Sequence, residues 1–89
     1  MLSNQTRTLV ATPNTWTVIN IPVGATDFVL GVETNTATFR IAVDNTLDPS
    51  TQGLFVAATG LYSHEGTTTA QLTIYLSASV ATFAILQYN

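Results

Sequence analysis

The chain has 89 residues, enough for one domain with a modest core and too few for a two-domain enzyme or an enclosed cofactor cavity. Charged residues make up 8% of it, whereas a soluble domain usually has about 25%. The chain has only two basic residues, both arginine, and a net charge of −3, which argues against binding to nucleic acid or to an anionic membrane surface. Because cysteine is absent, disulfides, thiolate catalysis and cysteine-based zinc sites are excluded.

The N-terminal segment MLSNQTRTL lacks the basic end and apolar run of a secretory signal peptide, so we expect synthesis in a cytosol. Polar residues interrupt the uncharged segment 66–89 too often for a membrane-spanning helix. Residues 1–8 offer little to bury, so we expect a flexible N-terminal arm there. A single domain is then expected over residues 9–89.

Short segments with alternating apolar and polar residues dominate the chain, and this period is typical of strands. In chain order, they predict strands at 7–12, 16–21, 27–33, 38–43, 54–58, 61–65, 70–77 and 80–88. Turn residues such as Pro13, Pro22 and Gly24 separate them. The polar segment 44–53 has no period and is predicted to be the longest exposed loop.

No segment has a helical period with caps, and the abundance of Thr and Val weakens helix throughout. Seven or eight short strands therefore predict an all-β fold, a two-sheet antiparallel β-sandwich. We expect a Greek-key or jelly-roll-like order, because loop 44–53 could carry a strand across the end of the sandwich.

Candidate catalytic residues are few. His64 precedes Glu65, but neighbours on a strand point to opposite faces, so a base with its orienting carboxylate is not expected. The serines lack a histidine and acid context, and no glycine opens a phosphate-binding helix. We therefore expect no enzymatic activity and no cofactor or metal.

Two polar groups allow alternatives. Asp44, Asn45 and Asp48 could supply oxygen ligands to calcium, but the loop lacks the spacing of a calcium-binding loop, and turn capping is the simpler explanation. Arg40 could anchor a carboxylate on a neighbouring subunit or equally pair with Glu33 across a hairpin.

An aromatic platform for sugar would need rings on one surface. Trp16, Tyr62, Tyr75 and Tyr88 are spread over four predicted strands, so core and interface roles are expected for them instead.

The last predicted strand is apolar on both faces, because Phe83 and Ile85 alternate with Ala84 and Leu86. One of these pairs must face outward. Together with the scarcity of charge, this predicts a homo-oligomer, and a trimer is the expected form. The residues expected at interfaces are Leu2, Asn4, Arg7, Arg40, Phe83, Ile85, Leu86 and Tyr88.

The order of these features resembles a known class of proteins. A chain without Lys or Cys carries a tryptophan strand at 16–21, then Pro22-x-Gly24-Ala25, a strand with one outward arginine at 38–42, and two late hydrophobic strands ending in Ile85-Leu86-Gln87-Tyr88. Over most of residues 16–88 it is similar to the small β-sandwich virion proteins of tailed bacteriophages. These proteins serve as head decoration (cement) proteins or as small fibre and spike heads.

The resemblance implies a structural protein, made in the host cytoplasm, that binds the major capsid protein on the outer surface of the head and stabilises the shell. It brings no catalytic residues. The alternative is a receptor- or carbohydrate-binding module of a phage fibre or spike, or a bacterial lectin-like domain. A small enzyme or inhibitor domain is a third possibility.

Overall fold

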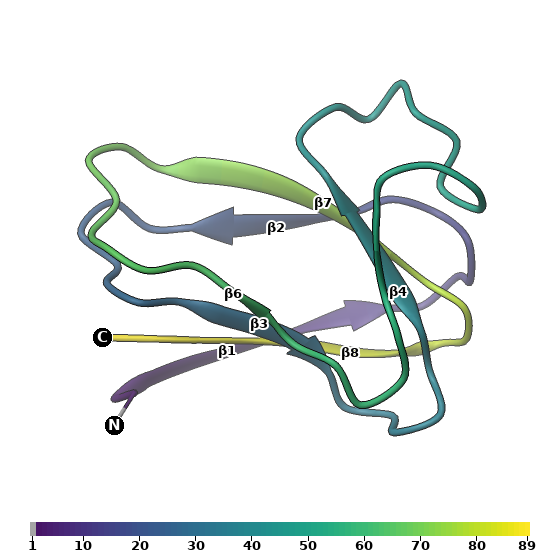
Figure 1. Ribbon diagram of the computed structural model, residues 1–89, viewed down its shortest axis with the longest axis horizontal. Coiled ribbons are helices and arrows are strands. Elements are labelled where there is room, and N and C mark those ends of the chain that lie inside the picture. Colours follow the sequence, from purple (N-terminus) through teal and green to yellow (C-terminus); the bar gives the residue numbers. More distant parts are fainter. Residues whose placement is uncertain (1) are drawn as a thin grey trace.

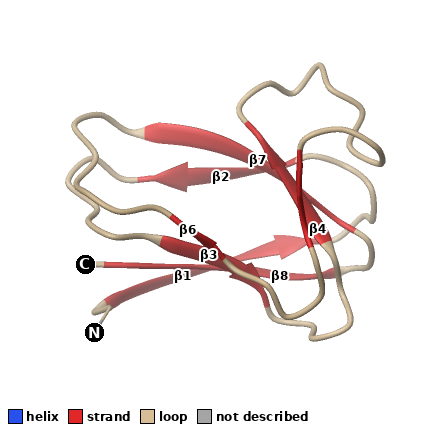
Figure 2. Ribbon diagram, viewed as in Figure 1, coloured by secondary structure: helices blue, strands red, loops and turns tan. Residues whose placement is uncertain are grey.

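The computed structural model describes residues 2–89, and this part of the chain is all-β (Figure 2). Each predicted segment overlaps one strand. The strands are β1 (Asn4–Val10), β2 (Thr17–Ile21), β3 (Val29–Val32), β4 (Phe39–Ala42), β5 (Leu54–Val56), β6 (Tyr62–Ser63), β7 (Leu72–Ala78) and β8 (Thr82–Tyr88).

Two antiparallel four-stranded sheets form the sandwich, which confirms the predicted fold class (Figure 1). Sheet 1 has the order β1-β8-β3-β6 and sheet 2 the order β2-β7-β4-β5. The first half of the chain pairs with the second in a nested way, β1 with β8, β2 with β7, β3 with β6 and β4 with β5. Because successive pairs alternate between the two sheets, the nested hairpin is rolled into a jelly roll.

The core lies between the sheets and takes alternate side chains from the strands, most clearly from β2, β4 and β8. Phe28, Leu30, Phe39 and Leu76 are almost completely buried. β8 adds Ala84 and Leu86 to this core, which places Phe83 and Ile85 on the outer face of sheet 1.

The N-terminal segment departs from the expected flexible arm. Residues 4–8 belong to β1, which pairs with β8 from Asn4 opposite Tyr88 to Val10 opposite Thr82. Polar side chains do not prevent this, because the backbone of β8 supplies the hydrogen-bond partners. Met1, the first residue of the expected arm, lies outside the described residues.

Loop 44–53 is mostly exposed, as predicted, and is hydrogen-bonded to Trp16, just before β2, and to Ser77 of β7. The indole Nε1–H of Trp16 donates to the Leu47 carbonyl oxygen at 2.8 Å. The Ser77 hydroxyl donates to the Pro49 carbonyl oxygen at 2.8 Å. The loop therefore covers part of sheet 2, and no comparable segment is tied over the central strands of sheet 1 among the described residues.

Replacing a core leucine tests the packing. Leu30 has no exposed surface, so Leu30→Ala should lower the free energy of unfolding by about 2–5 kcal/mol through lost burial and a residual cavity. Val43→Ala is the matched control, because Val43 is 84% exposed and its loss should change stability by less than about 0.5 kcal/mol. Urea unfolding measures both, and equal effects would contradict the described core.

Candidate interaction surface

The residues considered for catalysis have structural explanations. The His64 ring stacks on Phe28 with ring centroids 4.9 Å apart, and the His64 backbone N–H donates to the Phe28 carbonyl oxygen. Within residues 2–89, no three His, Asp or Glu side chains gather in a way that could hold a metal ion.

The acidic residues of loop 44–53 cap turns. Asp44 Oδ1 accepts hydrogen bonds from the Thr46 backbone N–H at 2.9 Å and from its hydroxyl at 2.8 Å. Asp48 Oδ1 accepts in the same way from Ser50 at 2.9 and 2.7 Å. The backbone hydrogen bonds, followed by those from the hydroxyls, lower the pKa of both carboxyl groups. This geometry matches the turn-capping alternative.

The outer face of sheet 1 carries an uncovered apolar surface, which we call the apolar face and define by Leu9, Val29, Leu61, Phe83 and Ile85. The strand register brings these residues to one face. Leu9 lies opposite Phe83, and Val29 lies opposite Gln87, which faces outward like Phe83 and Ile85. Leu61 lies over Gly31, because a Cβ atom added to Gly31 would be only 2.6 Å from Cδ2 of Leu61. Leu9 is 55% and Leu61 65% exposed, so this face offers apolar contact to another protein.

An ion pair crosses the apolar face. The Arg7 guanidinium donates to Glu33 Oε2 from Nη2 at 2.8 Å and from Nε at 3.0 Å. It also lies 4.0 Å from the centroid of the Phe83 ring. About half of each charged side chain is exposed, so the pair stabilises the fold by only about 0–1 kcal/mol. Its larger effect is to neutralise both charges on this face.

This ion pair excludes one of the two roles considered for Arg40, and the contact with a neighbouring subunit stays a prediction. Glu33 is bound to Arg7, so the pairing of Arg40 with Glu33 across a hairpin is wrong. Arg40 instead lies on sheet 2, with its guanidinium 5.0 Å from the centroid of the Phe55 ring. Its charge also contributes, as the smallest cause, to the lowered pKa of Asp48.

The structure divides the expected interface residues. Phe83, Ile85 and Arg7 share the outer face of sheet 1, whereas Leu86 is only 2% exposed and cannot belong to a surface patch. Tyr88 packs against the core. Asn4 is exposed opposite Tyr88, Leu2 is partly buried beside the start of β1, and Arg40 lies on the other sheet.

The aromatic residues do not form a platform. Tyr62 and Tyr88 pack against the core, Trp16 donates a hydrogen bond to loop 44–53, and Tyr75 lies opposite Val18 in sheet 2. The expected core role is confirmed for Tyr62 and Tyr88, and an interface role for the other two stays a prediction.

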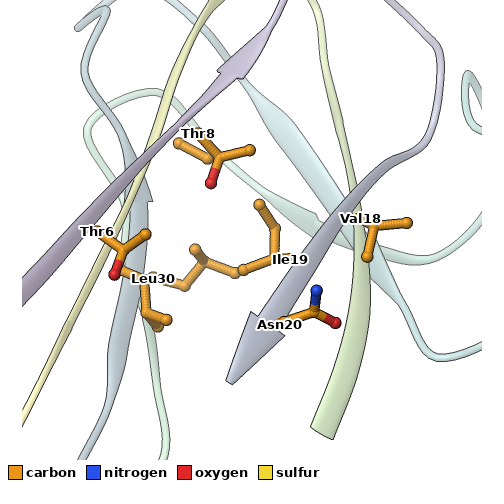
Figure 3. Close-up of a pocket in the computed structure, with 8 residues that line it drawn as sticks. Thr6, Thr8, Val18, Ile19, Asn20 and Leu30 are labelled. Atoms are coloured by element: carbon orange, nitrogen blue, oxygen red, sulfur yellow. The ribbon is translucent and has the colours of Figure 1, made fainter. Parts of the chain in front are cut away.

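A cleft between the edges of β1 and β2 could not be located from the sequence (Figure 3). It has a volume of about 160 Å³. Thr6 and Thr8 of β1 and Asn20 of β2 line it above an apolar floor that includes Ile19 and Leu30. The lining has no charged group, so the cleft suits neutral contacts. It could be found only by knowing that the edges of β1 and β2 lie on the same side of the sandwich.

Comparisons with known proteins give no relative: no family model, no curated protein and no solved structure matches the chain. The described residues contain no helix with the length and apolar character needed to cross a bilayer.

Acid titration tests the turn-capping role. Because the folded pKa of Asp44 and Asp48 lies below the ordinary value of 3.8, the stability they contribute is present above that pH and is lost as the pH falls through the lowered pKa. In NMR titrations, both carboxyl groups should have midpoints below 3.8. Thr46→Ala removes one hydroxyl donor and should raise the Asp44 midpoint only. A wild-type midpoint at or above 3.8 for either group would refute the capping described here.

Proposed function

We propose that the protein is a structural virion component of a tailed bacteriophage, a decoration (cement) protein that binds the outer surface of the head shell. The observation that carries this proposal is the uncovered apolar face of sheet 1, on which the charges of Arg7 and Glu33 neutralise each other within the chain. A surface of this kind suits permanent contact with another protein rather than turnover of a substrate.

The fold supports the proposal by analogy. Jelly-roll sandwiches occur in viral capsid proteins and also in lectins, so the strand order favours these two classes without choosing between them. The cleft between β1 and β2 gives no support to the second class, because the residues that line it include no aromatic ring on which a sugar could stack.

The low charge supports contact that does not depend on salt. Only seven residues, Lys+Arg 2 and Asp+Glu 5, carry a formal charge, and two of them are already paired in Arg7 and Glu33. Screening by salt weakens ion pairs much more than apolar contact. A decoration protein of this composition would hold the major capsid protein mainly by apolar and neutral hydrogen-bonded contacts.

Within this proposal the working unit is a homo-oligomer, and a trimer is the form we expect. A cyclic trimer would let each subunit contact two neighbours, and part of the apolar face would be covered by them. The remaining surface would contact the capsid protein. The site of action would be the outer capsid surface, reached after synthesis in the host cytoplasm.

Counting copies on purified phage particles tests the function. We expect the protein on full heads at a high, uniform copy number that follows the symmetry of the shell, measured by quantitative mass spectrometry and imaging. Absence from heads, together with specific binding of the isolated protein on a glycan array, would overturn the proposal and favour the receptor- or carbohydrate-binding alternative.

A charge placed on the apolar face tests its role in assembly. Ile85→Asp should break the homo-oligomer, because a carboxylate is costly to bury in an apolar contact, while far-ultraviolet circular dichroism stays that of the wild type. Thr73→Asp is the control, since Thr73 is exposed on the outer face of sheet 2. Sedimentation velocity should show a smaller species for Ile85→Asp only. An unchanged assembly in a folded Ile85→Asp variant would exclude this face as the contact.

A further inference from the structure

The free edge of β1 is the longest sheet edge in the described chain. Of the four edge strands, β5 has three residues and β6 has two, which makes them poor templates for pairing. β2 has five residues and is followed directly by Pro22. β1 has seven residues and is paired only on its β8 side.

The backbone groups that point away from β8 can be identified from the register. The Glu33 N–H donates to the Phe83 carbonyl oxygen, so odd-numbered residues of β8 bond to β3 and even-numbered ones to β1. Thr6 lies opposite Leu86 and Thr8 opposite Ala84, so the backbone groups of both threonines bond to β8. The backbone N–H and C=O groups of Gln5, Arg7 and Leu9 therefore point outward along the free edge.

β1 lacks the features that normally keep an edge unpaired. It contains no Pro and no Lys, and its pairing with β8 runs without a bulge. Its single charge, Arg7, is bound to Glu33 across the sheet instead of guarding the edge. An exposed edge of this kind is a template for pairing with another strand.

We propose that two copies of this chain pair antiparallel through their β1 edges, with Thr6 of one copy opposite Thr6 of the other. The two copies of sheet 1 then form one continuous sheet around a two-fold axis. In this register Gln5 exchanges backbone hydrogen bonds with Arg7 of the second copy, using the outward groups identified above. The contact is isologous, as in most dimers, and together with the cyclic trimer proposed above it would join two trimers into a hexamer.

The side chains favour this register over two others, those with the axis through Arg7 or through Thr8. An axis through Arg7 would place two arginines directly opposite each other, and like charges in that position are destabilising. An axis through Thr8 would place Thr6 opposite Val10 and Arg7 opposite Leu9, which pairs polar with apolar residues. The axis through Thr6 pairs Thr8 with Asn4, Arg7 with Gln5 and Val10 with Leu2, and in this register only Leu9, opposite Ser3, is an apolar residue facing a polar one.

The available area also fits a second copy. The view in Figure 1 is along the shortest axis of the molecule, and the two sheets are seen edge-on. The side of the sandwich formed by the strand edges therefore spans the two longer dimensions, 30 and 27 Å. The outer faces of the sheets are limited by the shortest dimension, 19 Å. A stable interface buries about 800 Å² on each partner. The side that holds the edges of β1 and β2 is broad enough for most of this, and pairing there would also cover the cleft lined by Thr6, Thr8 and Asn20.

Cysteine crosslinking tests the register directly, because the wild-type chain has no cysteine. On the dimer side Thr6 would occupy a non-hydrogen-bonded pair, with Cα atoms about 4.5 Å apart, which a disulfide can span. Thr6→Cys should therefore oxidise to a covalent dimer on a non-reducing gel. Thr8→Cys is the matched control on the same strand and face, since its two copies would lie about 14 Å apart. Crosslinking of both variants or of neither would overturn the proposal.

Blocking the edge gives a second test. Gln5→Pro removes an outward N–H and leaves the hydrogen bonds between β1 and β8 in place, and proline is tolerated where the N–H faces away from the sheet. Gln5→Ala is the control that loses the same side chain but keeps the N–H. Sedimentation equilibrium should give half the wild-type mass for Gln5→Pro and the full mass for Gln5→Ala. An unchanged mass for a folded Gln5→Pro would overturn the pairing.

Hydrogen exchange in the wild-type protein covers the case in which Gln5→Pro fails to fold. The amide protons of Gln5, Arg7 and Leu9 should become slower to exchange as the protein concentration rises. Fast exchange at every concentration, beside protected amides in β8, would contradict the paired edge. All three tests use the isolated protein, so their failure would leave the capsid proposal standing, and failure of that proposal would leave the pairing intact.

Discussion

The antiparallel ladder that holds β8 between β1 and β3 is the interaction on which the rest of the structure depends. It joins the two ends of the chain, so the nested hairpin closes and both sheets can bury a common core. Because neighbouring residues of a strand face opposite ways, the same ladder sends Ala84 and Leu86 into the core and turns Phe83 and Ile85 outward. The fold and the apolar face thus have one origin.

Charge scarcity shapes the surface that this ladder creates. Arg7 and Glu33 neutralise each other over Phe83, and Asp44 and Asp48 are occupied in capping turns of one loop. Neither arrangement leaves a strong field with which to attract a charged ligand. Beside a few charged residues such as Asp27 and Glu65, the exposed surface consists mainly of apolar side chains, hydroxyls, amides and backbone edge, and these groups favour contact with another protein surface or strand.

The sequence predicted the strands and loop 44–53 because both depend on local patterns, a period of two and a run of turn residues. It could not predict which face of β8 is buried, because either face of that strand is apolar and only the partners decide. The ordering of residues 4–8 was missed for the same reason, since their partner lies at the other end of the chain. The Arg7–Glu33 pair and the cleft beside β1 likewise depend on contacts between distant segments.

We expect the isolated chain to associate with itself, because it leaves the apolar face and the β1 edge uncovered. The mass of the wild-type protein at micromolar concentration, from sedimentation equilibrium at moderate salt, tests it most directly. Self-association predicts at least twice the 9.5 kDa of one chain, with little change when salt is raised. A mass of 9.5 kDa at every concentration would contradict it, because the apolar face and the β1 edge would then be stable in water without a second copy.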